Sequence, residues 1–329
     1  MTIVNELPHA QSSTPARAPA ASLDLAGIVV QLRSARERWR EQQARPREVS
    51  GRELPSREAL AAIVDGLRGA LFPMRLGPPD LRQESEDYFV GHTLDTALHA
   101  LIVQVRLELR YQARSANAAT PALDERAVDI VREFGAALPR IRDLLDSDVL
   151  AAYRGDPAAR SVDEVLVCYP GLHAMIHHRI AHQLHSLGVP LLARIVAELA
   201  HGGTGIDIHP GARIGSHFFI DHGTGVVIGE TAVIGNNVRV YQAVTLGAKR
   251  FETDAEGALH KGGARHPIVE DDVVIYAGAT VLGRVTIGRG ASIGGNVWLT
   301  RSVPPGTRIT QASARDDRAG NDADSGAGR

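Results

Sequence analysis

Residues 226–247 read VVIGETAVIGNNVRVYQAVTLG, with an aliphatic residue at every sixth position. The spacing extends from Ile208 to Leu299, broken by two extra residues within 221–225 and by a polar insertion at 248–267. The aliphatic positions are Ile208, Ile214, Ile220, Ile228, Ile234, Val240, Leu246, Val269, Ile275, Val281, Ile287, Ile293 and Leu299. This period fits neither the roughly 3.6-residue repeat of an α-helix nor the roughly two-residue repeat of a paired strand.

A six-residue period is typical of a hexapeptide solenoid. Three hexapeptides close one triangular coil, the aliphatic side chains point to its axis, and successive coils stack as parallel strands. Glycine follows several aliphatic residues, for example at Gly229 and Gly235, and supplies the tight corner that this repeat needs. The stretch therefore predicts a left-handed parallel β-helix.

The composition indicates an intracellular protein with two domains. The chain has 329 residues, a formal net charge of −2 and one cysteine, Cys168. The balanced charge gives no indication of a nucleic-acid partner. No apolar run approaches the roughly 20 residues of a membrane span, so no membrane partner is expected. A single cysteine excludes a disulfide framework and suits the cytoplasm.

The rest of the chain predicts an α+β protein, with an all-α N-terminal domain before the β-helix. Helices are expected at 22–43, after Pro55, around 94–109 and around 128–145, and two more between residues 163 and 200, broken near Pro190. The predicted parts are a disordered leader at 1–21, a helical domain at 22–200, a β-helix at 201–306 with an inserted loop at 248–267, and a flexible tail at 307–329.

Histidines gather on one helical segment of the N-terminal domain. His178, His182 and His185 follow one another at i, i+4 and i+7 and could share a helix face as metal ligands. No cysteine or nearby carboxylate completes the set. A polar or packing role is favoured, and no metal is expected.

Chemistry is expected where the β-helix loses its regularity, because the repeat itself is inert. The two extra residues within 221–225 lift His222 out of the coil. Asp207 lies fifteen positions earlier, a little less than one coil, so the two side chains can face each other. A carboxylate beside an imidazole raises its basicity, and a general base of this kind can activate an alcohol. A surface histidine in a turn is the simpler alternative.

Several motifs together resemble those of the serine O-acetyltransferase family, which belongs to the hexapeptide-repeat acyltransferases. The likeness covers roughly residues 54–305. The segments that carry it are 156–159 (DPAA), 168–174 (CYPGLHA), 204–212 (TGIDIHPGA), 219–225 (FIDHGTG), 228–232 (IGETA), 242–247 (QAVTLG) and 265–267 (RHP).

The resemblance implies transfer of an acetyl group from acetyl-CoA to the hydroxyl of L-serine, the first step of cysteine biosynthesis. It implies that His222 is the general base and Asp207 its partner. The residues implied to bind serine are Asp156 and Asp221 at the ammonium, Arg265 at the carboxylate and His266 near the reacting oxygen. Small residues that would let CoA approach the backbone are Gly247, Ala277 and Gly295.

The resemblance also implies a homotrimer with sites between neighbouring subunits, and in some members a dimer of trimers. Members that bind O-acetylserine sulfhydrylase end in isoleucine, whereas this sequence ends in Gly328 and Arg329, so that complex is not expected. The insertion after Gly247 is longer than the usual loop.

Two other functions fit the repeat. An acetyltransferase could act on another hydroxyl acceptor such as homoserine, although Asp156, Asp221 and Arg265 form an amino-acid clamp that disfavours a sugar. A γ-class carbonic anhydrase is also a β-helix trimer, and it holds zinc through three histidines. In this sequence those histidines would be His217, His222 and His266.

Overall fold

The computed structural model describes residues 23–43, 54–115, 122–249 and 262–312. The chain divides into two compact units, residues 1–52 and 53–329. The first contains helix α1 (Leu25–Gln42), which begins where the Asp24 carboxylate accepts the Gly27 N–H at 2.9 Å. This helix confirms the one expected at 22–43. The leader predicted at 1–21 lies outside the described residues.

The second unit begins with helices, as the sequence predicts. They are α2 (Arg57–Leu71), α3 (Pro73–Leu76), the 3₁₀ turn η1 (Gln83–Ser85), α4 (Glu86–Ser115), α5 (Leu123–Gly155), α6 (Val162–Cys168), α7 (Pro170–Ser186) and α8 (Pro190–Thr204). None of the described helices is long and apolar enough to cross a membrane. The sequence predicts two helices between 163 and 200, but described residues 162–204 form three. Pro170 explains the difference, because the residue before a proline avoids helical geometry and so ends α6.

The short strands that follow stack into three parallel sheets within the described residues. Sheet A holds β1 (Asp207–Ile208), β4 (Val227–Ile228), β7 (Thr245–Gly247), β10 (Thr280–Leu282) and β13 (Trp298–Leu299). Sheet B holds β2 (Arg213–Ile214), β5 (Val233–Ile234), β8 (Ile268–Val269) and β11 (Thr286–Ile287). Sheet C holds β3 (Phe219–Ile220), β6 (Arg239–Val240), β9 (Val274–Ile275), β12 (Ser292–Ile293) and β14 (Arg308–Ile309).

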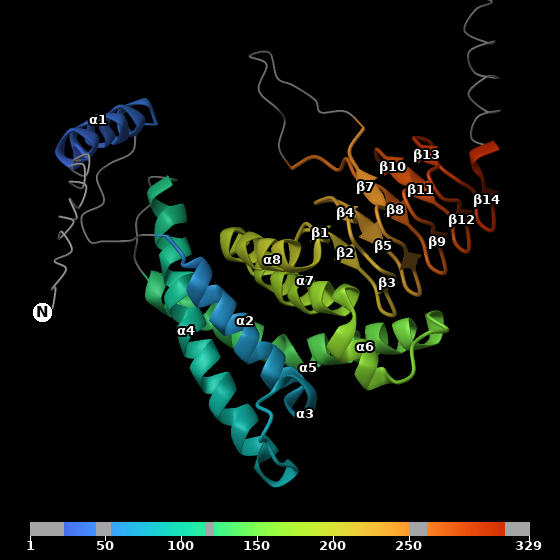
Figure 1. Ribbon diagram of the computed structural model, residues 1–329, viewed down its shortest axis with the longest axis horizontal. Coiled ribbons are helices and arrows are strands. Elements are labelled where there is room, and N and C mark those ends of the chain that lie inside the picture. Colours follow the sequence, from blue (N-terminus) through green and yellow to red (C-terminus); the bar gives the residue numbers. More distant parts are fainter. Residues whose placement is uncertain (1–22, 44–53, 116–121, 250–261, 313–329) are drawn as a thin grey trace, which may run out of the picture. The chain divides into compact units, whose positions relative to one another are not determined.

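The chain visits the sheets in the constant order A, B, C, so each coil turns three corners, which we call the A–B, B–C and C–A corners. Figure 1 shows the strands stacked in this succession, with α7 and α8 beside the first of them. The coil confirms the predicted hexapeptide repeat as three stacked parallel sheets.

The aliphatic residues predicted to point to the axis are buried, with relative exposures of 4% or less, except Ile214, which is half-buried. The predicted β-helix ends at residue 306, and in the structure the coil continues by one more strand. Strand β14 pairs with β12, and Ile309 is buried. The tail beyond 312 and loop residues 250–261 lie outside the described residues.

A buried ion pair joins the helices to the first coil. The Arg179 guanidinium of α7 contacts the Asp148 carboxylate of α5 at 3.0 Å and donates to the carbonyl oxygens of Ile214 and Gly215. Asp148 also accepts the Phe218 N–H at 2.9 Å. Every polar group of this pair therefore has a partner, which a buried pair requires. The contact fixes α5 and α7 against the start of the β-helix.

Among the histidines of α7, His177 and His178 are buried, whereas His173, His182 and His185 are half-buried. His178 is 2% exposed, and His182 Nδ1 contacts the Pro210 carbonyl oxygen at 2.8 Å. Burial lowers the pKa of His178 well below its usual value, and the pKa of His182 in the same direction. These contacts agree with the packing role that the sequence favours.

We expect acid to destabilise this helical core through His177. Burial lowers the pKa of His177 to about 4, whereas the unfolded chain keeps the ordinary value of 6.5. The stabilisation is therefore complete above pH 6.5 and is lost as the pH falls toward 4, by at most about 3 kcal/mol in the free energy of unfolding.

Thermal unfolding of His177→Gln at pH 7.5 and pH 5 measures this contribution. The variant should lose less stability between the two pH values than the wild type, whereas the exposed-histidine control His92→Gln should match the wild type. Comparison at each pH removes the contribution of Asp148, whose pKa burial raises to about 6 and which acts in the opposite direction. Equal pH dependence in His177→Gln and wild type would contradict the assignment.

Candidate active site

His222 stands at the C–A corner of the first coil, outside the regular repeat. At this corner a left-handed residue lies two positions before each strand of sheet A, as at Gly225 and Ala243. His222, with φ 59°, is an additional left-handed residue supplied by the two extra positions. Its side chain is 71% exposed. The structure therefore confirms that the interruption lifts this imidazole out of the coil.

Two carboxylates lie beside His222. Asp221 Oδ1 is 3.8 Å from His222 Nε2, and the Asp221 side chain is only 10% exposed. Asp156 follows the end of α5 and lies close enough to His222 for a charge on the imidazole to lower the pKa of its carboxylate. Residues 65 positions apart in the sequence thus meet at one corner (156 and 221).

Tyr169 fixes the orientation of Asp156. Its hydroxyl donates to Asp156 Oδ2 at 2.5 Å, and the Ala158 N–H donates to Oδ1 at 2.8 Å. The Tyr169 hydrogen bond is the main reason why the pKa of Asp156 lies below its ordinary value. The same bond raises the pKa of Tyr169 to about 12. Asp156 is therefore an ionised carboxylate, suited to binding a cation.

Arg239 is the cation already present in this cluster. Its guanidinium contacts Asp221 Oδ2 at 2.5 Å and donates to the Gly155 carbonyl oxygen at 2.7 Å. The guanidinium carbon lies 4.9 Å from the ring centre of Phe219 and 4.6 Å from that of Tyr241. The C–A corner thus combines an exposed imidazole with two carboxylates and one fixed arginine.

Arg265 and His266 occupy a different corner, the A–B corner between β7 and β8. Arg265 contacts Glu230 Oε2 at 2.6 Å, and its backbone N–H donates to Thr231 Oγ1 at 2.9 Å. Its guanidinium is 27% exposed. Glu230 and Thr231 therefore hold Arg265 at the surface of this corner.

The His266 ring is held in one tautomer. The Thr231 N–H donates to His266 Nδ1 at 3.0 Å, so the proton of the neutral ring is on Nε2. Burial, followed by the charge of Arg265, lowers the pKa of His266 to about 4, which keeps the ring neutral. A Cβ at Gly229 would lie 2.0 Å from this ring, so only glycine leaves room for it. Nε2–H is thus available as a hydrogen-bond donor.

Five of the six predicted catalytic and substrate-binding residues therefore form two groups. Asp156, Asp221 and His222 meet at the C–A corner, whereas Arg265 and His266 lie at the A–B corner, on the other edge of sheet A. Within the described residues of one chain, the structure does not bring the two groups together. The three histidines of the anhydrase alternative are also apart, because His217, His222 and His266 stand at three different corners.

Asp207, the predicted partner of His222, begins β1 at the same C–A corner. Gly223, which follows His222, packs against Ile206, which precedes Asp207: a Cβ at Gly223 would lie 2.4 Å from Ile206 Cδ1. The Asp207 carboxylate, however, lies with Glu198 and His201, the ligand atoms of all three being within 4.8 Å of one another. The charged contact of His222 among the described residues is Asp221. The Asp207–His222 dyad stays a prediction.

The small residues predicted to contact CoA are divided between the edges of sheet A. Ala277 and Gly295 are neighbours at the C–A corner, where a Cβ at Gly295 would lie 3.2 Å from the Ala277 carbonyl oxygen. Gly247 ends β7 at the opposite edge. Ala277 and Gly295 thus continue the corner that carries His222.

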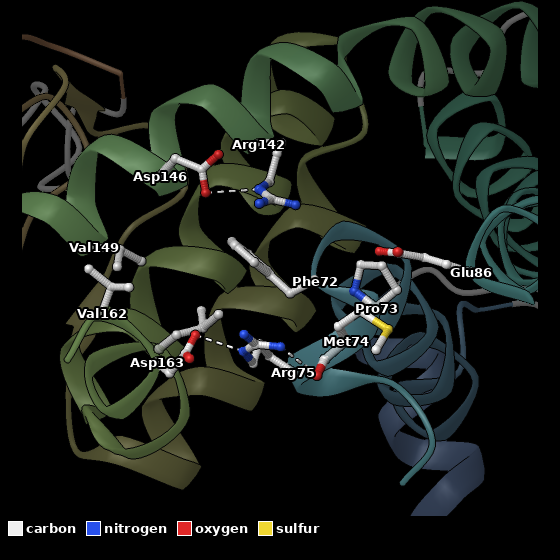
Figure 2. Close-up of a pocket in the computed structure, with 11 residues that line it drawn as sticks. Phe72, Pro73, Met74, Arg75, Glu86, Arg142, Asp146, Val149, Val162 and Asp163 are labelled. Atoms are coloured by element: carbon white, nitrogen blue, oxygen red, sulfur yellow. Dashed lines mark hydrogen bonds and ion pairs between the residues drawn. The ribbon is translucent and has the colours of Figure 1, made fainter. Parts of the chain in front are cut away.

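A separate pocket of about 250 Å³ lies among the helices (Figure 2). It is lined by Phe72, Pro73, Met74, Arg75, Glu86, Arg142, Asp146, Val149, Val162, Asp163 and Leu166. Its arginines are already paired, Arg75 with Asp163 at 2.7 Å and Arg142 with Asp146 at 2.9 Å. It contains none of the predicted site residues, so we do not assign the reaction to it.

Comparison with known proteins identifies the family of this chain. Residues 266–301 match the family model described as bacterial transferase hexapeptide (six repeats). A protein of Synechococcus elongatus described as "Serine acetyltransferase, plasmid" is 62% identical over 267 residues, which cover 80% of this chain and 84% of that relative. This chain belongs to the serine acetyltransferase family. The resemblance found in the sequence motifs is thereby confirmed.

Solved structures of the serine acetyltransferase family share the fold. Isoform 3 from Entamoeba histolytica, in complex with cysteine, is 38% identical with a TM-score of 0.64, and the match covers 76% of this chain and 80% of that one. Serine acetyltransferase 1 from the same organism, in complex with L-cysteine, is 34% identical with a TM-score of 0.65, covering 86% and 99%. Both the helical layer and the β-helix are thus features of the family.

Four further residues that contact the site had no predicted role, namely Tyr169, Arg239, Glu230 and Thr231. Tyr169 lies in the motif at 168–174, and Glu230 and Thr231 follow Gly229 in the motif at 228–232. The signal for Arg239 is the hexapeptide register, which pairs it with Phe219 on the neighbouring coil, two residues before Asp221. Because Arg239 directly precedes the axis residue Val240, this register could have predicted that it lies close to Asp221.

Proposed function

We propose that this protein transfers the acetyl group of acetyl-CoA to the hydroxyl of L-serine, giving O-acetyl-L-serine and CoA, the first step of cysteine biosynthesis. The family supports the reaction. The observation that carries it to this chain is the grouping of ionised Asp156, buried Asp221 and exposed His222 at one corner. Two anions beside a potential base suit an acceptor with an ammonium group near its hydroxyl.

The proposed roles follow from the charges of the acceptor. Asp156 and Asp221 receive the ammonium of serine. Arg265, whose guanidinium already pairs with a carboxylate in Glu230, receives the carboxylate of serine. The Nε2–H of His266 donates to the oxygen that becomes negative during the reaction.

His222 acts as the general base, with Asp207 as its partner. A free hydroxyl is a poor nucleophile at neutral pH, so the imidazole takes its proton as the oxygen attacks the thioester carbon. The tetrahedral intermediate then collapses, the carbon–sulfur bond breaks, and the imidazolium returns the proton to the departing sulfur. The exposure of His222 leaves room for both substrates.

In this proposal, one subunit supplies only half of each active site, and a neighbouring subunit supplies the other half. The two halves stand on different edges of one β-helix, and a threefold assembly can set the C–A corner of one subunit against the A–B corner of the next. We therefore propose a homotrimer, which can pair further into a dimer of trimers. Acetyl-CoA would enter along the C–A corner, with Ala277 and Gly295 near its pantetheine arm and Gly247 contributing from the adjacent subunit's edge.

Further parts of the proposal concern the chain as a whole. We propose the left-handed coil sense that hexapeptide repeats adopt. We propose that the chain divides in function into the helices that precede residue 201 and a β-helix that begins at 201 and extends past the predicted end at 306 to β14. The cytoplasm is the proposed location, because acetyl-CoA is an intracellular metabolite. No metal takes part in the proposed reaction.

The proposal predicts CoA release that depends on L-serine. Purified protein with acetyl-CoA should produce free thiol with L-serine, much less with homoserine, and only background without acceptor, because an added methylene displaces the hydroxyl from the base. Zinc content and CO₂ hydration are measured on the same sample. Equal or faster release with homoserine would favour the alternative acceptor, and bound zinc with CO₂ hydration would favour the anhydrase.

A further inference from the structure

Arg239 links the two elements that carry the carboxylates of the C–A corner. One amino group of its guanidinium contacts the Asp221 carboxylate at 2.5 Å, and the other donates to the carbonyl of Gly155 at 2.7 Å. Gly155 ends α5 and directly precedes Asp156. A single side chain from β6 therefore holds both the helix end and the corner.

The surroundings of Arg239 restrict its guanidinium to this position. The group lies near the rings of Phe219 and Tyr241, at 4.9 and 4.6 Å from their centres, and the side chain is 24% exposed. Gly155 packs directly on Phe219, since a Cβ there would lie 2.9 Å from that ring. The end of α5 can thus approach β3 closely enough for one arginine to reach both.

The charge of Arg239 matters as much as its reach. Two carboxylates that share a site repel each other. A fixed cation offsets one of the two negative charges. Asp156, Asp221 and Arg239 together then carry one negative charge, and the ammonium of the acceptor neutralises it. The occupied corner therefore carries no net charge when His222 is neutral.

We propose that Arg239 is a positioning residue of the amino-acid site: its guanidinium fixes Asp221 and the helix end bearing Asp156 in one geometry that receives the acceptor's ammonium. This inference rests on the proposed function. Arg239 does not touch the acceptor. It acts through the two aspartates, which distinguishes it from the catalytic residues.

Steady-state kinetics of Arg239→Met test the proposal. Methionine preserves the apolar contacts with the rings and removes the charge and both hydrogen bonds. We expect KM for serine to rise roughly tenfold, with kcat within about threefold and KM for acetyl-CoA unchanged. The acid limb of kcat/KM for serine should move to higher pH, because a carboxylate without its cation holds a proton more tightly. Arg239→Lys should restore the pH profile but only part of the affinity.

Arg308→Met is the matched control, because Arg308 is the exposed first residue of β14 in the same sheet. Circular dichroism and thermal unfolding show whether each variant folds, and if Arg239→Met does not, the lysine variant decides. An unchanged KM for serine and an unchanged pH profile in an active enzyme would overturn the role of Arg239 alone. A wild type without serine-dependent CoA release would overturn the proposed function and this inference with it.

Discussion

Replacing His222 with asparagine is expected to lower kcat for serine-dependent CoA release at least about a hundredfold, the scale of losing a general base. His222 is the exposed imidazole beside Asp156 and Asp221, and an amide cannot take the proton of the hydroxyl. Asparagine is the informative substitution because the backbone of His222 has the left-handed conformation, with φ 59°, which asparagine also tolerates. Thermal unfolding should therefore change little.

His217→Asn is the matched control for this experiment. His217 is also left-handed, with φ 58°, but it stands at the B–C corner, where its backbone N–H donates to Ser147 Oγ. We expect it to retain activity within a few-fold of wild type. If His222→Asn keeps most of its activity, the base is another group. If His217→Asn loses as much as His222→Asn, the loss reflects corner geometry rather than proton transfer.

The β-helix was predictable because its signal is local and repeated. Ile228 and Leu246 belong to different hexapeptides, and the structure pairs them in adjacent strands of sheet A. The interruption at 221–225 was predictable for the same reason, since a regular period exposes any extra residue. The last strand was missed because Pro304 and Pro305 obscure the spacing, although Ile309 lies buried beyond them.

The details of the site depend on contacts that no spacing encodes. Arg239 was identifiable as a neighbour of Phe219, but its hydrogen bond to Gly155 joins residues 84 positions apart and depends on where α5 ends. Spacing predicted that Asp207 stands at the same corner as His222, yet the contacts of α8 decide that its carboxylate lies near His201. The partners of a long side chain depend on the tertiary structure, and the sequence period does not specify them.

A second large effect is expected when two inactive variants are combined. His222→Asn removes the base at the C–A corner, and Arg265→Met removes the guanidinium at the A–B corner. The latter should lower kcat/KM for serine by about a hundredfold, the scale of losing one partner of a close charge pair. Because these corners lie on different edges of sheet A, each variant keeps intact the half that the other has lost.

Mixed trimers should therefore recover activity. If each site joins His222 of one subunit to Arg265 of its neighbour, every trimer that contains both variants has two intact halves together at one of its three sites, so about one third of wild-type kcat/KM is expected. The variants are co-expressed with different affinity tags, and trimers carrying both tags are isolated before assay.

The control combines His222→Asn with the double variant His222→Asn/Arg265→Met, a mixture that contains no intact base and should remain inactive. Recovery in the first mixture and none in the control would mean that the site is assembled from two chains. A first mixture that stays at the level of its parents would contradict the shared site. The ammonium and carboxylate subsites would then have to meet within one chain, by a movement of the A–B corner across sheet A that the many contacts of Thr231, Arg265 and His266 resist.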